Sequence, residues 1–302
     1  MKTLKHLGEF NFIKSIAKGC LKHKSVVKGI GDDAAVVQLE KDLFLLFTAD
    51  MLIEDVHFKR NQPPQLIGHK AVACSISDIA AMGGTPRYAL ISVAFPKDLK
   101  VSVALGIYRG MQKTAKKFGL SIIGGDTNSA DKIIIDVSMC GIAAGGKFVL
   151  RSGARKGDLI FVTGKLGGSH KGRHLDFTPR LKEARFLTDG YPVHAMIDIS
   201  DGLISDLGHI LEQSKKGAVI WQECVPVSQK ADSWKDAFFT GEDFELLFTV
   251  GQSCAYDLKK RWPFKKVKLT CIGEITAANK GLRIKDKNGK LKRAKAGGWR
   301  HF

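Results

Sequence analysis

Short apolar runs alternate along the chain with longer segments in which apolar residues recur every three or four positions. The apolar runs are bounded by glycine or acidic residues and predict β-strands at residues 43–50, 88–95, 120–126, 133–143, 158–164, 195–201, 244–250 and 267–275. The helical spacing predicts helices at residues 66–83, 102–119 and 202–217, and the last two close on a glycine that follows lysines. This alternation indicates a mixed α/β protein.

One break in the alternation divides the chain. Residues 143–158 are rich in glycine and basic residues and separate two halves that each contain strands, so we expect two domains, 1–146 and 147–302, with the boundary near Gly146. Residues 164–180 are too polar and glycine-rich for regular structure, which predicts a loop. The pair Asn288 and Gly289 tolerates the positive φ angles of a tight turn and predicts a hairpin around it.

Acidic residues gather where predicted strands end and at glycine turns. They are Asp32, Asp33, Asp50, Asp78, Asp126, Asp198, Asp201, Glu242 and Asp243. Strand ends carry the ligand sites of many α/β folds, although a turn or a helix cap explains any single one of these carboxylates as well. Carboxylates that converge without basic partners repel one another unless a cation holds them. Oxygen ligands without a histidine or cysteine cluster indicate Mg²⁺ or a similar hard cation, which pairs with nucleotide phosphates.

Common phosphate-binding motifs are missing from the sequence. It contains no G-x-x-x-x-G-K-[ST] loop and neither of the protein-kinase motifs H-R-D and D-F-G. Phosphoryl transfer would therefore depend on metal ions and on glycine turns such as "IIGGD" at 122–126, whose backbone N–H groups can meet phosphate oxygens.

The chain of 302 residues carries a formal net charge of +18, which raises the alternative of a nucleic-acid-binding protein. Its lysines are spread without a recognition-helix or zinc-finger pattern, and anionic small-molecule ligands explain them at least as well, so we do not expect a nucleic-acid partner. The sequence has no run of about 18 apolar residues and no apolar signal-peptide core, which predicts a soluble protein without a membrane partner. Six scattered cysteines indicate reduced thiols in the cytoplasm.

A series of short motifs runs in order over nearly the whole chain. The motifs are "GEFNFI", "GIGDDAAVV", "TADMLIEDVHF", "SISDIAAMGGTPRYALISVAFP", "IIGGDT", "RSGARKGD", "IDISDGLISDLGHI", "TGEDFELLFTV" and "GGWRHF". In this order they resemble the thiamine-monophosphate kinase family, within the ATP-binding superfamily that also holds aminoimidazole ribonucleotide synthetase, selenophosphate synthetase and a hydrogenase maturation factor. Selenophosphate synthetase and the hydrogenase maturation factor fit less well, because each would require a reactive cysteine near one end of the chain.

The resemblance implies an α/β (α+β) fold in a two-domain, PurM-like architecture. An N-terminal mixed α/β domain would dimerise through its sheet, and a C-terminal α/β domain would complete the ATP and substrate site. The expected assembly is a homodimer with each active site in the cleft between an N-terminal domain and its C-terminal partner domain.

The same resemblance implies that ATP phosphorylates thiamine monophosphate to thiamine diphosphate, with release of ADP, as part of thiamine diphosphate biosynthesis. Several Mg²⁺ ions would be held by Asp33, Thr48, Asp50, Asp78, Asp126, Asp198 and Asp201. ATP would be bound by Tyr108, Gly125, Asp126, Arg151 and Ser200. Thiamine monophosphate would be bound by His57, Glu242 and Trp299, the last by stacking. Because the acceptor phosphate is ionised near neutral pH, no residue is assigned as a general base.

Several of these side chains have a purely structural alternative. Arg151 could be a surface arginine in a linker, and Tyr108 could pack on its own helix. His57 could be a half-buried histidine, Trp299 a core aromatic and Glu242 a turn cap.

Two features depart from the family pattern. Ala49 stands between Thr48 and Asp50 where the family usually has threonine, so a metal ligand there could come only from the backbone. Residues 164–180 are shorter than usual, so a helix that relatives carry there is missing or remodelled, and "PSPR" is reduced to "TPR". Three alternative functions stay open: a sibling ATP-dependent enzyme with another small substrate, a basic RNA-binding protein, and an inactive relative kept for dimerisation.

Overall fold

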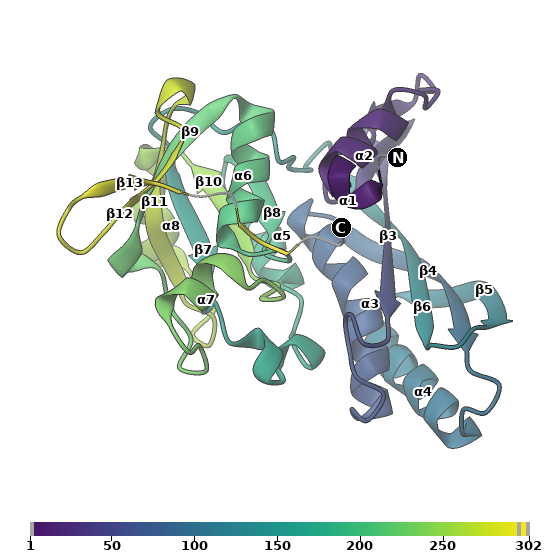
Figure 1. The fold of residues 1–302 in the computed structure, drawn as a ribbon. Helices are drawn as coiled ribbons and strands as arrows, with labels where there is room; N and C mark the ends of the chain where they lie inside the picture. The colour runs from purple at the N-terminus through teal and green to yellow at the C-terminus, as the bar shows by residue number, and fades with distance from the viewer. Residues whose placement is uncertain (1–2, 295–296, 300–302) are drawn as a thin grey trace.

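A computed structural model describes residues 3–294 and 297–299 and shows two β-sheets side by side (Figure 1). The first sheet has the strand order β1-β2-β3-β6-β4-β5, and the second has the order β13-β12-β9-β11-β7-β10-β8. The first contains β1 (Val26–Lys28), β2 (Ala35–Glu40), β3 (Leu43–Ile53), β4 (Thr85–Phe95), β5 (Ser121–Ser129) and β6 (Ile134–Ala144). The second contains β7 (Leu159–Thr163), β8 (Val193–Asp198), β9 (Lys216–Trp221), β10 (Leu246–Val250), β11 (Leu269–Ala277), β12 (Leu282–Lys285) and β13 (Leu291–Arg293).

Helices cover one face of the first sheet and both faces of the second. The α-helices are α1 (Leu4–Leu7), α2 (Glu9–Ala17), α3 (Pro64–Ala81), α4 (Val101–Phe118), α5 (Leu181–Gly190), α6 (Leu203–Ser214), α7 (Trp234–Phe239) and α8 (Gln252–Arg261). Short 3-10 turns are η1 (Ser169–Lys171), η2 (Arg173–Leu175), η3 (Gln222–Cys224) and η4 (Ala278–Lys280). Most neighbouring strands are antiparallel, whereas β4 pairs with β5 and β9 pairs with β12 in parallel.

Helix α3 lies at the centre of the molecule. One side packs on β3 and β6, another on α4, and a third on α5, β8 and η2 of the second half. It approaches α4 closely, since a Cβ added at Gly68 would lie 1.9 Å from the Ile107 carbonyl oxygen and one at Gly110 would lie 2.0 Å from that of Gln65. Because α3 is enclosed on nearly all sides, its polar side chains must be satisfied inside the protein.

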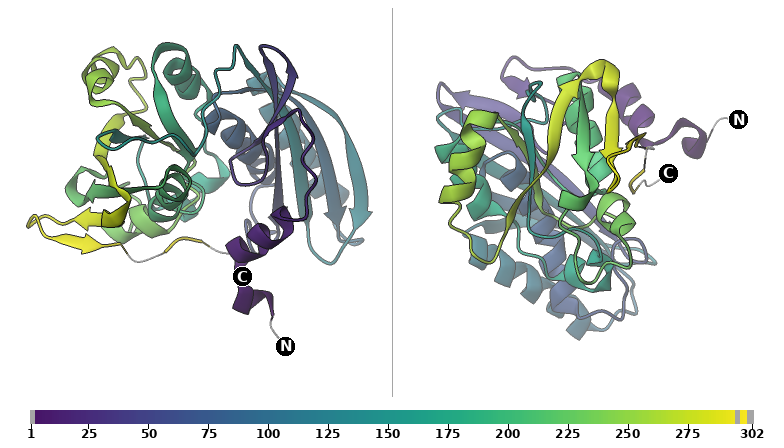
Figure 2. Two further views of the ribbon diagram at one scale, coloured as in Figure 1. Left: turned by 90° about the horizontal axis from the view of Figure 1, so that it is seen from above. Right: turned by 90° about the vertical axis from the view of Figure 1, so that its left-hand side faces the viewer.

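The other face of the first sheet is not covered by any part of the described chain (Figure 2). Large apolar side chains are exposed there because this face has no helix to bury them. They are Phe47 (44%), Met51 (53%), Tyr88 (49%), Leu90 (48%) and Ile123 (60%). An exposed apolar face of this extent is typical of surfaces that contact another molecule.

The second sheet buries both faces, and its strands alternate accordingly. Ile160 and Val162 point into one core with Leu207 of α6, whereas Phe161 points into the other core and stacks on Phe248 at 5.6 Å between ring centroids. Leu258 of α8 also packs in this second core. The period of two in β7 therefore places successive residues in different cores.

The eight strand predictions are confirmed, with ends that shift by up to three residues. The three predicted helices correspond to α3, α4 and α6, and β12 and β13 form the hairpin around Asn288 and Gly289. Gly119 caps α4 at φ 70°, as expected. The prediction of a closing glycine after α6 is wrong: Lys215 takes the left-handed cap at φ 54°, and Gly217 lies in β9.

Residues 164–180 are more regular than predicted. They form η1 and η2, and the backbone is turned by glycines with positive φ at Gly164, Gly167, Gly168 and Gly172. The glycines that argued against regular structure are thus the residues that make these tight turns. The domain boundary near Gly146 stays a prediction, and it falls between β6 and β7, where one sheet ends and the other begins.

Candidate active site

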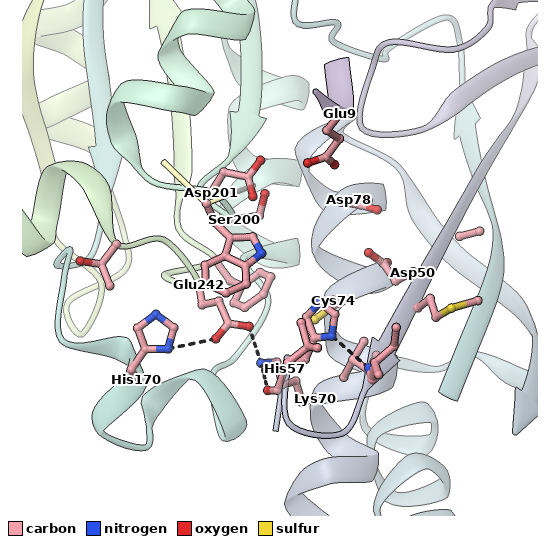
Figure 3. A pocket seen from close by; sticks show the side chains of 18 residues that line it. Glu9, Asp50, His57, Lys70, Cys74, Asp78, His170, Ser200, Asp201 and Glu242 are labelled. Atoms are coloured by element: carbon pink, nitrogen blue, oxygen red, sulfur yellow. Dashed lines mark hydrogen bonds and ion pairs between the residues drawn. The ribbon is translucent and has the colours of Figure 1, made fainter. Parts of the chain in front are cut away.

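A cleft of about 550 Å³ lies between α3 and β3 on one side and the loops of the second half on the other (Figure 3). Lys70, Cys74 and Asp78 of α3 all line it. They are spaced by four residues, so they share the helix face that is turned to the cleft. One helix therefore contributes to both ends of this cleft.

Hydroxyl groups hold the carboxylates at the Asp78 end. Thr48 donates to Asp78 at 2.5 Å between oxygen atoms. Ser75 donates to Asp50 at 2.7 Å, and Ser77 donates to Asp198 of β8 at 2.5 Å. These contacts fix carboxylates of β3, α3 and β8, and among the described residues neither Asp50 nor Asp78 forms an ion pair with a basic side chain.

Three carboxylates converge beyond the end of α3. Oxygen atoms of Asp33, Asp78 and Asp198 lie within 4.8 Å of one another. Burial, and then the charges of Asp50, Asp198 and Asp33, raise the pKa of Asp78 well above its ordinary value. Burial and the charge of Asp33 raise the pKa of Asp198 to about 7. These shifts mean that the ionised cluster is unfavourable without a cation.

Arg151 and Asp32 both contact Asp33 of this cluster. The Arg151 guanidinium pairs with Asp33 at 2.8 Å, and its backbone N–H donates to Asp32 at 3.0 Å. Lys28 pairs with the second oxygen of Asp32 at 3.2 Å. The neighbouring acids thus have different surroundings: Asp33 faces the cluster, whereas Asp32 ties the turn to the segment that connects the two halves.

Glu242 forms the opposite wall. Its carboxylate accepts from Lys70 and lies 3.2 Å from His174 Nδ1 and 3.4 Å from His170 Nδ1 (Figure 3). Burial favours a higher pKa, but the hydrogen bond from His174 and the Lys70 charge lower the pKa of Glu242 to about 2. Its backbone has φ 54°, an uncommon conformation for a residue with a side chain. Strained backbone of this kind is concentrated at functional sites.

His57 and Trp299 line the same wall. His57 Nδ1 accepts from the backbone N–H of Ile53 at 2.9 Å, so a neutral His57 carries its proton on Nε2. The Trp299 backbone N–H donates to the Asp201 carbonyl oxygen at 3.0 Å, which ties the C-terminal segment to the loop after β8. Ser200 and Asp201 from this loop line the cleft as well.

Of the predicted site residues, Asp33, Thr48, Arg151 and Asp198 do not line this cleft but adjoin it through the carboxylate cluster, whereas Tyr108, Gly125 and Asp126 lie apart from both. Asp126 and Gly125 lie in β5 and are exposed, and a Cβ at Gly125 would lie 1.8 Å from the Ile91 carbonyl oxygen, so only glycine fits there. Tyr108 is half-buried in α4 and packs against the first core, as its structural alternative proposed. The structure leaves their roles in ligand binding as predictions.

Known proteins match this chain over most of its length. Residues 31–143 match the family model described as AIR synthase related protein, N-terminal domain. A thiamine-monophosphate kinase of Buchnera aphidicola subsp. Schizaphis graminum is 37% identical, and the match covers 97% of this chain and 99% of that one. The thiamine-monophosphate kinase of Bacillus subtilis (strain 168) is 36% identical, with 91% and 93% covered. The chain belongs to the thiamine-monophosphate kinase family.

A solved structure of the family agrees in fold over the full length. AaThiL complexed with AMPPCP and TMP superposes with a TM-score of 0.86 at 34% identity and covers 100% of this chain and 99% of its own. Together with the two sheets, this match confirms the expected α/β (α+β), PurM-like fold. No helix of residues 3–294 and 297–299 is long and apolar enough to cross a membrane.

Five side chains that line the cleft or contact the carboxylates of the site were missed by sequence reasoning. They are Lys70, Ser75, Ser77, His170 and His174. Ser75 and Ser77 lie within three residues of Asp78 in the same motif, and a lysine at position 70 within an apolar helical run was a detectable signal. The histidines lie in the shortened segment 164–180, whose path could not be derived from its composition.

Proposed function

We propose that this protein transfers the γ-phosphoryl group of ATP directly to thiamine monophosphate, giving thiamine diphosphate and ADP. One observation carries the proposal: a single cleft joins the carboxylates Asp50 and Asp78 at one end to the Glu242 wall at the other. We assign Glu242, His57 and Trp299 to thiamine monophosphate. Relatives named for this kinase activity match nearly the whole chain, which supports the substrate.

The carboxylate cluster fits Mg²⁺ by its donor set. Asp33, Asp78 and Asp198 supply only oxygen atoms, and within the described chain Asp33 Oδ2 is buried without a hydrogen-bond partner. We propose that several Mg²⁺ ions are held by Asp33, Thr48, Asp50, Asp78, Asp126, Asp198 and Asp201. Bound there, Mg²⁺ would neutralise phosphate charge and stabilise the charge that develops during transfer.

The chain's own residues position the two substrates. We assign Arg151, Ser200, Tyr108 and Gly125 to ATP. The Arg151 Nε atom is buried and has no hydrogen-bond partner among the described residues, so this guanidinium keeps a donor for a phosphate oxygen while it pairs with Asp33. No general base is required, because the acceptor is already an ionised phosphate.

We propose a homodimer that pairs the open faces of the first sheet. The exposed side chains of Phe47, Tyr88 and Leu90 give this face the apolar character of an interface. Asp126 lies on the same face, next to Ser92 in the register of β4 and β5, so its metal role belongs to the dimer and not to the cleft of one subunit.

The proposal also covers domain organisation and location. We assign residues 1–146 to the ATP- and Mg²⁺-binding, dimerising domain and residues 147–302 to the domain that completes the site. The six cysteines are free thiols, in keeping with an enzyme of the cytoplasm.

The activity is tested with purified protein, ATP, MgCl₂ and thiamine monophosphate, with thiamine diphosphate and ADP measured by chromatography. We expect equal amounts of the two products and none when MgCl₂ is replaced by EDTA. Turnover of another phosphate acceptor in place of thiamine monophosphate would refute the substrate assignment.

The site is tested with Asp50→Asn and Asp126→Asn. We expect both variants to fold and to lose turnover, because the bound cations lose charge partners. Asp189→Asn, which changes an exposed carboxylate that pairs with Lys147, is the control and should keep full activity. Wild-type rates in both site variants would contradict the proposed metal site.

A further inference from the structure

Lys70 is a buried lysine to which the proposed chemistry gives no role. Its side chain is 1% exposed, and its ammonium contacts three groups: the His57 carbonyl oxygen at 2.7 Å, His174 Nδ1 at 3.0 Å and Glu242 Oε1. The His57 carbonyl oxygen and the Glu242 carboxylate both accept hydrogen bonds from the ammonium. Pairing of this kind is what makes a buried charge tolerable.

The three groups in contact with Lys70 come from both halves of the chain. His57 follows β3 in the first half, whereas His174 of η2 and Glu242 lie in the second half. The ammonium on α3 therefore joins the two sides of the cleft at its Glu242 wall. A second lysine pair joins the halves at the surface, where Lys14 and Glu212 are 61% and 60% exposed. Of these two lysine pairs, that of Lys70 with Glu242 lies in the cleft, whereas that of Lys14 with Glu212 does not.

Lys70 is the lysine that contacts the Glu242 carboxylate directly. The groups that face this carboxylate are Lys70, His174 and His170, with the Cys74 thiol close by. Glu242, His170 and His174 have atoms close enough to ligate a metal ion. The Lys70 ammonium already contacts two of these residues, and a like charge disfavours a metal cation beside it.

We infer that Lys70 is a positioning residue for thiamine monophosphate, which orients the Glu242 carboxylate in the cleft and fixes the spacing between the two halves at this wall. The inference rests on the proposed function. Lys70 acts through Glu242 and the His57 backbone, at the end of the cleft opposite the carboxylate cluster. Its loss should therefore change the use of thiamine monophosphate much more than the use of ATP.

The test compares Lys70→Met with Lys14→Met, its exposed counterpart. For Lys70→Met we expect KM for thiamine monophosphate to rise about tenfold or more while KM for ATP changes by less than about twofold. Lys14→Met should match the wild type in both. Equal rises of both KM values, or no rise in either, would overturn the inference.

A pH profile separates positioning from a general structural effect. In the wild type Glu242 is ionised over the whole neutral range, so it adds no acid limb to kcat/KM for thiamine monophosphate. Without the Lys70 charge, burial is opposed only by the His174 contact, so the pKa of Glu242 should rise and an acid limb should appear at higher pH than in the wild type. Its absence in an active Lys70→Met variant would contradict an action through Glu242.

The double variant Lys70→Met/Glu242→Gln covers the case in which Lys70→Met does not fold, since it leaves no buried carboxylate unpaired. If Lys70 acts through Glu242, the double variant has the same KM as Glu242→Gln alone, and additive effects would overturn the inference. Wild type and Lys14→Met are measured first. If neither forms thiamine diphosphate, the proposed function fails; if both do and Lys70→Met equals them, only the role of Lys70 fails.

Discussion

Removing one charge from the carboxylate cluster should stabilise the metal-free protein while it abolishes activity. Asp198 is suited to this test because it is 2% exposed and lies beside Asp33 and Asp78. The substitution Asp198→Asn keeps the shape of the side chain and an oxygen that can accept from Ser77. It removes only the negative charge, so stability then reports the electrostatics of the cluster.

The size and the sign of the effect follow from the pKa of Asp198. A pKa of about 7 in the folded protein, against an ordinary value of 3.8, corresponds to at most about 4 kcal/mol of lost stability at pH 8. Between these two values the folded state holds a proton that the unfolded state has released. Stability of the metal-free wild type is therefore highest at low pH in this range and falls as pH rises to about 7.

The assay is thermal unfolding in EDTA at several pH values, followed by the same series with MgCl₂. We expect Asp198→Asn to melt roughly 5 °C higher than the wild type in EDTA at pH 8, equal to about 2 kcal/mol, and to lose most of the fall with pH. Magnesium should stabilise the wild type more than the variant. A variant less stable than the wild type in EDTA at pH 8 would refute the repulsion argument.

Three further changes test the fold, the substrate wall and the dimer. Gly110→Ala should destabilise the protein by about 1–3 kcal/mol, because its Cβ would meet the Gln65 carbonyl oxygen. Gly208→Ala in α6 has open space around it and should stabilise the protein by about 0.5–1 kcal/mol. Both changes in the free energy of unfolding are measured by chemical denaturation. Trp299→Ala should raise KM for thiamine monophosphate about tenfold, because the stacking contact is lost. KM for ATP, measured in the same steady-state assays, should stay unchanged. Leu90→Arg should give a monomer in light scattering, since it places a charge on the open sheet face.

The elements were readable from the sequence wherever one physical signal dominated. Apolar runs bounded by glycine, such as 158–164, gave β7 because both faces of this strand are buried. The missed helix α5 is amphipathic but begins directly after the polar segment 164–180. Its N-cap residue Arg180 is not a typical capping residue, so no local sequence signal marks the start of this helix. The missed strand β9 was hidden by the helical pattern of α6, which runs into it after the unexpected cap at Lys215.

The site could be predicted only in part, because the strand order decides which of the acidic residues meet. The recurrence of acids at strand ends predicted a shared cluster, and the structure brings Asp33, Asp78 and Asp198 together although they are far apart in the sequence. Asp126 has the same local context but lies in β5, on the exposed face of the first sheet. Which strand ends meet depends on strand order, and a single sequence does not contain that order.

Helix α3 fixes the distance between the two ends of the cleft. Lys70 and Asp78 are eight residues apart on one face, so the helical rise sets about 12 Å between the Glu242 wall and the carboxylate cluster. Gly68 locks this helix against α4, and its remaining sides are enclosed by both halves of the protein. The distance between the two ends of the cleft is thus set along a buried helix. A fixed distance of this kind suits in-line transfer, because small displacements between the acceptor and donor phosphates lower the rate.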